Sequence, residues 1–397
     1  MTKNVLFVGK CSTYTTATSI LEKTKKNPGF QIIKFINLLL EGLRYHKTNI
    51  SVISNIDTSS TAINNETENE IKYKYIPTIH IPLICQATYY ICAFFNTLKW
   101  GIKHRKNSII ICDICSSNST TSGCILAAKI LKIPACAIIT DMLSTPITTS
   151  INTTNFFWKL FLKLRKYKQY RSLLSYDGFI FLTKYMNEVY NPKDKPYIIM
   201  EGSIDHSFIP NNTICKRDPK VILYAGAIEK EYGFNELVKA FMSLPTQNIE
   251  LHVYGNGKFV NKLLEYQKID SRVKYMGVVS NEQIVEEEQR ATLLVNPRLS
   301  HEEFVKYSCP SKTSEYMLSG TPLVTTKLCG IPDEYFQYVY TFEQETIEGF
   351  AKTLIKILSI PEEELIIKGK EAQDFVLKNK NNIIQAQRIK DFLDLIY

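Results

Sequence analysis

Short runs of apolar residues alternate along the whole chain with longer segments in which apolar residues recur every three or four positions. The short runs resemble buried parallel strands in length and in their content of Val, Ile and Leu, and the longer segments have the period of helices. This alternation predicts an α/β protein with parallel sheets. The predicted strands cover residues 5–8, 50–53, 108–111, 135–140 and 178–182 in the first half, and residues 221–224, 251–254, 273–275, 292–296 and 323–325 in the second.

Three segments of the first half have the composition of helices, at residues 31–44, 123–131 and 156–175. Residues 76–100 are also apolar, but Pro, His, Asn and Lys interrupt them, and a membrane span needs roughly 20 uninterrupted apolar residues. We therefore expect a buried helix there. Residues 57–70 are rich in Ser, Thr and Asn, and we expect them to form a loop.

Residues 204–219 separate the two halves. They are rich in Gly, Asn, Asp and Pro and follow neither the helical nor the strand period, which is typical of a linker. We therefore predict an N-terminal domain at residues 1–203 and a C-terminal domain at residues 220–381. Residues 382–397 are predicted to form a final helix.

The charge of the chain is concentrated in its first half. The formal net charge is +9, and the first 200 residues hold 25 Lys and Arg against 11 Asp and Glu, whereas the remaining residues hold 23 against 28. A basic half of this kind favours an anionic acceptor or surface. The absence of a signal peptide pattern predicts a cytoplasmic protein.

The basic excess is densest in residues 156–171, with the sequence FFWKLFLKLRKYKQYR. On a helix, Lys159, Lys163 and Lys166 share one face, and the opposite face carries Phe157, Leu160, Phe161 and Leu164. This pattern is typical of a helix at an anionic membrane surface, which predicts peripheral binding to the inner face of the membrane. A core helix with a solvated basic edge is the alternative. We expect no nucleic acid partner, because no recognition module accompanies the basic residues.

The cysteines do not indicate a metal site. Most of the ten lie within apolar runs, where a reduced thiol behaves as a small apolar group. Cys112 and Cys115 have the spacing of a redox or zinc motif, but no second pair or His cluster lies near them in the sequence. We therefore expect reduced thiols and no bound metal.

The most informative segment is residues 307–324, with the sequence YSCPSKTSEYMLSGTPLV. It predicts a short helix that begins after Pro310 and ends at Gly320. Because a helix N-terminus attracts anions, Ser311 and Lys312 are placed to hold a diphosphate, and Glu315 lies one turn further for a ribose. The alternative is an ordinary exposed i,i+3 pair of Lys312 and Glu315.

This segment resembles the donor-site motif of the family 4 retaining glycosyltransferases, in the branch that carries Pro-Ser-Lys-x-x-Glu-Tyr followed by Ser-Gly-x-Pro. Three further segments resemble parts of the same domain in the same order, at residues 221–226, 251–257 and 273–284. The resemblance implies the GT-B fold, in which two doubly wound Rossmann-like domains face a cleft. The N-terminal domain would bind the acceptor, the C-terminal domain would bind the nucleotide sugar, and the last helix would cross back to the N-terminal domain.

The implied reaction moves a sugar from a nucleotide-diphosphate donor, expected to be a UDP-sugar, to a hydroxyl of a glycan or glycolipid with retention of configuration. Surface polysaccharide synthesis is the expected setting. The resemblance implies no metal and no cofactor, since the nucleotide sugar is a substrate. Two alternatives stay open: a nucleotide-sugar epimerase of the same fold, and a noncatalytic nucleotide-sugar-binding scaffold.

The resemblance also implies roles for individual residues. Lys312 and Asp141 would be catalytic, and Asp141 has the alternative of a helix cap or turn residue. Gly29 and Lys34 resemble a loop that faces the donor phosphate and the acceptor. The expected donor-binding residues are Gly226, Lys230, Tyr254, Gly255, Glu303, Tyr307, Ser311 and Glu315.

The chain departs from the family pattern in two places. The first glutamate of the family's pair falls on Tyr307, so Glu302 or Glu303 is expected to replace it. The Arg and Lys that follow the first glycine turn in many members are missing, and Lys230 is the expected replacement for one of them.

Overall fold

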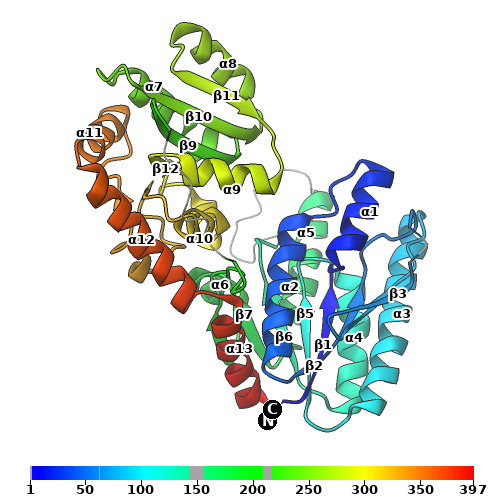
Figure 1. Ribbon diagram of the computed structural model, residues 1–397. Helices are drawn as coiled ribbons and strands as arrows, with labels where there is room; N and C mark the ends of the chain where they lie inside the picture. The colour runs from blue at the N-terminus through cyan, green and yellow to red at the C-terminus, as the bar shows by residue number, and fades with distance from the viewer. Residues whose placement is uncertain (1, 62, 144–155, 209–216) are drawn as a thin grey trace. The chain divides into compact units, whose positions relative to one another are not determined.

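The computed structural model describes residues 2–61, 63–143, 156–208 and 217–397 (Figure 1). The chain divides into two compact units. Unit 1 combines Met1–Ser203 with Asn382–Tyr397, and unit 2 is Ile204–Asn381. Each unit is built around its own sheet.

Unit 1 holds an eight-stranded sheet in the order β3-β4-β2-β1-β5-β6-β7-β8. The pairs are parallel except for β3 and β4 at one edge, which are antiparallel. Central strands are fully buried because helices cover both faces, which explains their continuous apolar sequences. The strands are β1 (Asn4–Gly9), β2 (Asn49–Ser54), β3 (Asn65–Glu68), β4 (Ile71–Tyr75), β5 (Ser108–Asp113), β6 (Ala135–Ile139), β7 (Gly178–Phe181) and β8 (Tyr197–Ile199).

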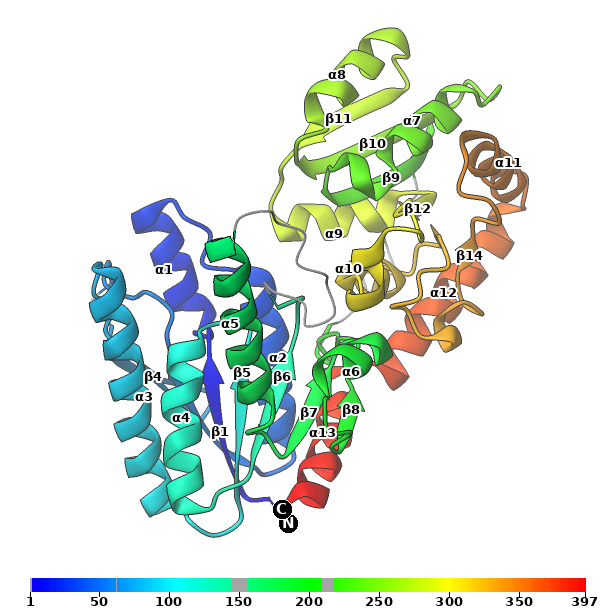
Figure 2. The same ribbon diagram turned by 180° about the vertical axis from the view of Figure 1, so that it is seen from behind.

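Helices lie on both faces of this sheet. On one face α2 packs against α13, so closely that a Cβ at Gly42 would lie 2.3 Å from the carbonyl oxygen of Asn382. The other face is covered by α3, α4 and α5 (Figure 2). The helices of unit 1 are α1 (Tyr14–Thr24), α2 (Phe30–Tyr45), α3 (Pro82–Lys103), α4 (Asn118–Leu131), α5 (Phe156–Leu173), α6 (Lys184–Tyr190) and α13 (Asn382–Ile396).

The sequence-based prediction was wrong for two segments of unit 1. Residues 57–70 are not loop throughout, because β3 pairs with β4. The helix predicted within residues 76–100 is present as α3 but is not buried: only Tyr89, Ala93, Thr97 and Gly101 are buried, and Phe95 is 60% exposed. Helix α1 was not predicted, although Thr13 caps it by accepting a hydrogen bond from Thr16 N.

Unit 2 holds a six-stranded parallel sheet in the order β11-β10-β9-β12-β13-β14. The strands predicted from the sequence are all present. They are β9 (Lys220–Ala227), β10 (Ile249–Asn256), β11 (Val273–Gly277), β12 (Leu293–Asn296) and β13 (Leu323–Thr325), with a short β14 (Tyr340–Thr341) at the edge.

The helices of unit 2 connect these strands in the doubly wound manner. Apolar side chains of both sheet faces form separate cores, and their largest fully buried members include Tyr316, Tyr335, Phe234, Phe241 and Phe350. The helices are α7 (Phe234–Met242), α8 (Val260–Ile269), α9 (Asn281–Arg290), α10 (Ser311–Leu318), α11 (Ile347–Leu358) and α12 (Glu362–Asn379), with 3-10 turns η1 (Lys230–Tyr232), η2 (Glu303–Tyr307) and η3 (Asp333–Tyr335).

Among the described residues, no helix is both long enough and apolar enough to cross a membrane.

Candidate functional site

Helix α10 begins where the sequence predicts, directly after Pro310, and Gly320 follows it with φ +75°. Tyr316, the sixth residue of α10, is fully buried. The Tyr316 hydroxyl accepts a hydrogen bond from Ala225 N at 2.6 Å and donates one to Ala225 O at 3.0 Å. These two bonds fix α10 beside the carboxyl end of β9, where ligands of open α/β sheets bind.

Lys312, in the first turn of α10, lies between two carboxylates. Its Nζ is 3.2 Å from Oε2 of Glu315 and 3.7 Å from Oε1 of Glu288. The Glu288 side chain, from α9, is only 3% exposed, whereas those of Lys312 and Glu315 are 30% and 27% exposed. The pair of Lys312 and Glu315 is therefore not the ordinary surface pair of the alternative interpretation, because a buried third charge takes part.

Burial and the two neighbouring carboxylates act on the pKa of Lys312 in opposite directions. Burial works against the ammonium, but attraction by Glu315 and Glu288 is stronger in sum and raises the pKa of Lys312. Lys312 is therefore held as a positioned cation at a helix N-terminus, where the first backbone N–H groups lack partners within the helix. This arrangement is suited to a phosphate group.

Two glycine turns lie at the carboxyl ends of β9 and β10. Gly226 and Gly255 are partners in the parallel register, and a Cβ at Gly255 would lie 1.8 Å from the carbonyl oxygen of Gly226. A Cβ at Gly257 would lie 2.1 Å from Ile228 O. The two turns therefore pack backbone against backbone, and only glycine allows this approach.

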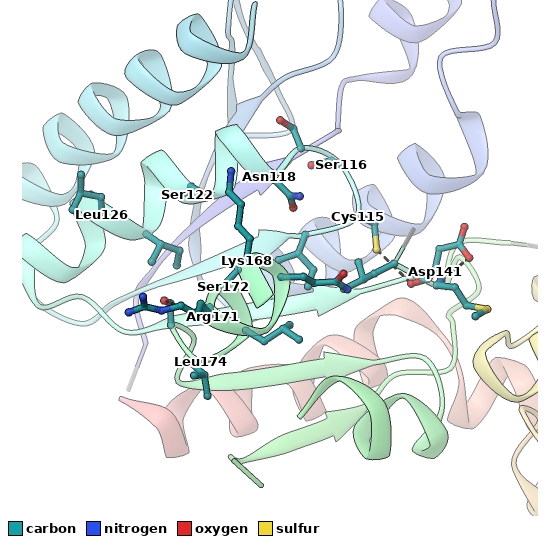
Figure 3. Close-up of a pocket in the computed structure, with 18 of the residues that line it drawn as sticks. Cys115, Ser116, Asn118, Ser122, Leu126, Asp141, Lys168, Arg171, Ser172 and Leu174 are labelled. Atoms are coloured by element: carbon teal, nitrogen blue, oxygen red, sulfur yellow. Dashed lines mark hydrogen bonds between the residues drawn. The ribbon is translucent and has the colours of Figure 1, made fainter. Parts of the chain in front are cut away.

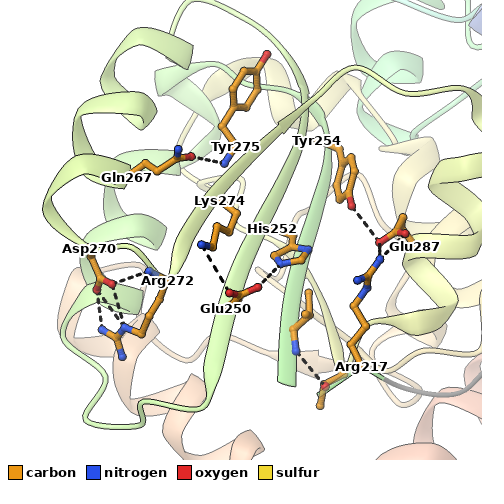
Figure 4. A network of polar contacts seen from close by, with 12 residues as sticks. Arg217, Glu250, His252, Tyr254, Gln267, Asp270, Arg272, Lys274, Tyr275 and Glu287 are labelled. Atoms are coloured by element: carbon orange, nitrogen blue, oxygen red, sulfur yellow. Dashed lines mark hydrogen bonds and ion pairs between the residues drawn. The ribbon is translucent and has the colours of Figure 1, made fainter. Parts of the chain in front are cut away.

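Tyr254, which the resemblance places in the donor site, is buried. Figure 4 shows its hydroxyl donating to Glu287 Oε2 at 3.0 Å, while Arg217 Nη2 donates to the two oxygens of Glu287 at 2.6 and 2.5 Å. Burial and the nearby Glu287 carboxylate raise the pKa of Tyr254. These contacts show Tyr254 joining β10 to α9, and its role as a donor ligand stays a prediction.

The remaining predicted donor residues lie on two 3-10 turns and the start of α10. Glu303, Tyr307 and Ser311 belong to η2 and to the first position of α10, so they adjoin Lys312 in the chain, and Glu303 and Ser311 are exposed. Lys230 is exposed at the start of η1, which follows the β9 glycine turn. Glu302 lies 3.8 Å from His301.

The sequence analysis did not identify two charged residues of unit 2 as candidate site residues. Glu288 stands in the run EEEQR, which resembles a solvated helix face, and nothing local indicates that this one carboxylate is buried. Arg298 follows the end of β12, and its guanidinium stacks 4.2 Å from the ring centre of Tyr232 and 5.6 Å from that of Phe304. Its position two residues after a predicted strand was the signal that could have identified Arg298.

Asp141 lies in unit 1 after β6, in a groove of about 800 Å³ between α4 and α5. Figure 3 shows Lys168 extending from α5 toward the start of α4, with Asp141 at the other end of the groove. The walls combine apolar side chains such as Ile125 and Leu126 with the hydroxyl and amide groups of Ser116, Ser117, Asn118, Ser122, Ser172 and Ser175. Asp141 Oδ1 also accepts a hydrogen bond from Met142 N, as a turn residue would.

The predicted glycine loop lies near a second lysine. Gly29 has φ +95° and caps α2, on which Lys34 is half-buried. A Cβ at Gly29 would lie 3.5 Å from Nζ of Lys10, which directly follows β1. Lys10 is thus a further candidate that the sequence analysis missed, although it follows a predicted strand.

Asp113 ends β5 and is buried beside Gly9, where a Cβ would lie 2.5 Å from that of Asp113. Burial raises the pKa of Asp113 to about 6, against hydrogen bonds from the backbone N–H groups of Cys115 and Lys10. Cys112 is buried next to Cys124, with the sulfur atoms 3.8 Å apart, whereas Cys115 is exposed. In the described part of the chain, no group of three or more His, Cys, Asp or Glu is placed to hold a metal ion.

Residues 206–376, within unit 2, match the family model described as glycosyl transferases group 1. Comparison with curated proteins found no match. Similar solved structures include sucrose-phosphate synthase from Thermosynechococcus elongatus, at 13% identity over 99% of both chains and a TM-score of 0.65. A glycosyltransferase from Rickettsia africae is similar over 100% of this chain and 98% of that one, at 13% identity and a TM-score of 0.66. Anabaena Alr3699/HepE in complex with UDP and glucose is 11% identical over 99% and 100% of the chains, with a TM-score of 0.60.

These similarities establish the fold, since they extend over both units. The chain has the GT-B glycosyltransferase fold, with two Rossmann-like domains. The family match itself is confined to residues 206–376 of unit 2, which make up less than half of the chain.

Proposed function

We propose that this protein is a retaining glycosyltransferase that moves a sugar from a UDP-sugar to a hydroxyl of a glycan or glycolipid. The observation that carries the proposal is the first turn of α10. There a lysine is held between two carboxylates at a helix N-terminus, and Tyr316 fixes that helix to the glycine turn of β9. The match to the group 1 family supports the same reaction class.

In this proposal the departing diphosphate is stabilised by unit 2. Lys312 and the first N–H groups of α10 would face the negative charge that develops on the leaving group. Their geometry exists before the donor binds, because Glu288 and Glu315 already hold the ammonium. Lys230 and Arg298, both after strands of the same sheet, would add positive charge.

Glu315 would accept hydrogen bonds from the ribose. Its Oε2 contacts Lys312, and each oxygen of an ionised carboxylate can accept more than one hydrogen bond. In unit 1, the groove that contains Asp141 would hold the acceptor, since its hydroxyl, amide and apolar walls suit a sugar attached to an apolar group. Glu302 or Glu303 would take the place of the family's first glutamate.

Calorimetry of nucleotide binding tests the donor site. We expect Glu315→Ala to weaken the binding of UDP by 10- to 100-fold, because a hydrogen bond to a charged group contributes about 1.5 to 3 kcal/mol. Glu265→Ala is the matched control, because Glu265 forms an i,i+3 pair with Lys262 on the surface of α8, with the atoms 2.6 Å apart. Equal affinity in the wild type and Glu315→Ala would refute the assignment.

The donor itself can be identified by thermal unfolding with a panel of nucleotide diphosphates and nucleotide sugars. A ligand present at 100 times its Kd stabilises the folded state by about 2.7 kcal/mol. We expect uridine nucleotides to give the largest increase in Tm. A larger increase in Tm with another base would assign a different donor nucleotide. Release of an epimerised nucleotide sugar without acceptor would favour the epimerase.

A further inference from the structure

The helices on one face of the unit 1 sheet contain no acidic residue. The 22 residues of α3, the 14 of α4 and the 18 of α5 include no Asp or Glu. They hold nine bases: Lys99, Lys103, Lys129, Lys159, Lys163, Arg165, Lys166, Lys168 and Arg171. On the opposite face, α2 and α13 mix the two signs, with Glu41, Asp391 and Asp394 among their charges. The face of α3, α4 and α5 is therefore strongly polarised.

The same face exposes apolar side chains in a regular row. On α3, Ile84, Ile91, Phe95 and Ile102 are separated by seven, four and seven residues, so they lie along one side of the helix. Their exposed fractions are 47%, 52%, 60% and 65%. Leu126 and Ile130 of α4 and Leu164 of α5 are exposed as well, at 42%, 58% and 59%. A continuous apolar row of this length is unusual on a surface that only contacts water.

Close packing holds α3 so that this row faces outward. A Cβ at Gly123 of α4 would lie 2.2 Å from the carbonyl oxygen of Tyr90, and a Cβ at Gly101 would lie 2.4 Å from Leu131. The side of α3 that carries Tyr89, Ala93 and Thr97 is buried. Helix α3 therefore cannot turn its apolar row inward without losing these contacts.

We propose that the face formed by α3, α4 and α5 docks on an anionic lipid bilayer, with the apolar row of α3 inserted among the lipid headgroups and the basic residues beside the phosphates. The sequence alone predicts membrane contact only for residues 156–171, and the structure adds α3 as the inserted element. A helix that carries an apolar stripe flanked by Lys binds in the plane of the membrane–water interface, with the stripe buried at the level of the headgroups. The described side chains of α5 contribute Lys163 and Lys168, both exposed.

The charge of the face argues against two other occupants. A second copy of the chain would bring two basic faces together, and the repulsion between like charges opposes such a dimer. Nucleic acid would be attracted by the basic residues, but its phosphates form no favourable contact with the exposed row of Ile and Phe. A bilayer provides phosphates for the basic residues and an apolar region for the row. The acceptor groove opens between α4 and α5 of this same face, so docking would bring the groove to the lipid surface.

Sedimentation with vesicles tests this proposal. We expect the wild-type protein to bind vesicles of phosphatidylcholine mixed with phosphatidylglycerol, to bind pure phosphatidylcholine weakly, and to be released by salt. Phe95→Glu should reduce binding to the mixed vesicles at least 10-fold. Lys99→Glu with Lys103→Glu should reduce it roughly 5-fold or more per charge, since each base near an anionic leaflet contributes about that factor.

The matched control is Ile367→Glu on α12 of unit 2. The Ile367 side chain is 58% exposed, and α12, unlike α3, contains acidic residues. It should bind vesicles as the wild type does. Thermal unfolding and UDP calorimetry of each variant verify that folding and the donor site are intact, so loss of docking is distinguished from failure of the proposed activity. Unchanged binding by Phe95→Glu, or no binding of the wild type at low salt, would overturn the proposal.

Two further results would also overturn it, in favour of another occupant. The first is dimerisation without lipid that Phe95→Glu abolishes. The second is binding to an oligonucleotide together with no binding to anionic vesicles.

Discussion

The two units differ in whether the charged side chains near their candidate sites have partners of opposite charge. In unit 2, the buried Glu288 faces Lys312, and Glu287 faces Arg217. In unit 1, the groove residues Lys168 and Arg171 have no carboxylate within ion-pair distance among the described residues, and the buried Asp113 relies on backbone N–H groups.

This difference separates a site that is organised in advance from one that awaits an external charge. A cation fixed by protein carboxylates costs little reorganisation when a phosphate binds, which is how preorganised electrostatics lowers a barrier. Cations without such partners stay hydrated and respond to salt, to lipid phosphates and to anionic acceptors. The first arrangement suits catalysis and the second suits reversible docking.

Removing Lys312 is expected to have the largest effect. Lys312→Ala should lower turnover by about 100-fold or more, because it removes a positioned charge from the leaving group. It should also lower the free energy of unfolding by roughly 2 to 3 kcal/mol, since it leaves the Glu288 carboxylate buried without its counter-charge. The second effect depends on the Glu288 side chain, which is only 3% exposed. Steady-state kinetics and urea unfolding measure the two effects.

A double variant separates the effect of Lys312 on turnover from its effect on stability. Lys312→Ala combined with Glu288→Gln should recover most of the stability, because the buried charge is gone, and turnover should stay low. Lys262→Ala, which breaks an exposed i,i+3 pair, is the control and should change neither quantity. Recovery of turnover in the double variant would show that Lys312 has only a structural role.

The buried Asp113 should make the stability of the protein depend on pH. Its pKa is raised from 3.8 to about 6 by burial, so the folded state binds the proton more tightly than the unfolded state. The stabilisation is fully present below about pH 4 and is lost as pH rises through 6, a decrease of roughly 3 kcal/mol for an isolated group. Asp113→Asn should remove this decrease, as measured by urea unfolding at several pH values between 4 and 8.

Asp177→Asn serves as the control, because Asp177 also accepts a backbone hydrogen bond, from Ala135 N at 2.9 Å, but is exposed. It should leave the pH profile unchanged. If wild type and Asp113→Asn lose stability equally between pH 4 and 8, Asp113 is not the group responsible.

Removing the groove cations should have the smallest effect on stability. Lys168→Ala with Arg171→Ala is expected to change the free energy of unfolding by less than about 0.5 kcal/mol, since neither side chain forms an ion pair in the described structure. Thermal unfolding checks this expectation. A large destabilisation would mean that these cations are structural, and the contrast between the two units would then fail.

The sequence itself determined much of unit 2. Its strands are short and mostly apolar, so the predicted positions of β9 to β13 agree with the structure, and β13 agrees in both bounds. Pro310 and Gly320 delimited α10 because one residue favours a helix start and the other a helix end. The sequence was sufficient to predict interactions between residues that are close in the chain, such as the pair of Lys312 and Glu315.

Tertiary structure alone decided which charges are buried and which apolar residues are exposed. Glu288 and its neighbours Glu286 and Glu287 look alike in the sequence, but the tertiary structure places only Glu288 beside Lys312, where Thr321 Oγ1 donates a hydrogen bond to the Glu288 carbonyl oxygen. In the same way, α3 has the composition of a buried helix, but only one side of α3 is buried, and its outer apolar row is exposed. Burial depends on partners distant in the chain, and a local pattern carries no information about them.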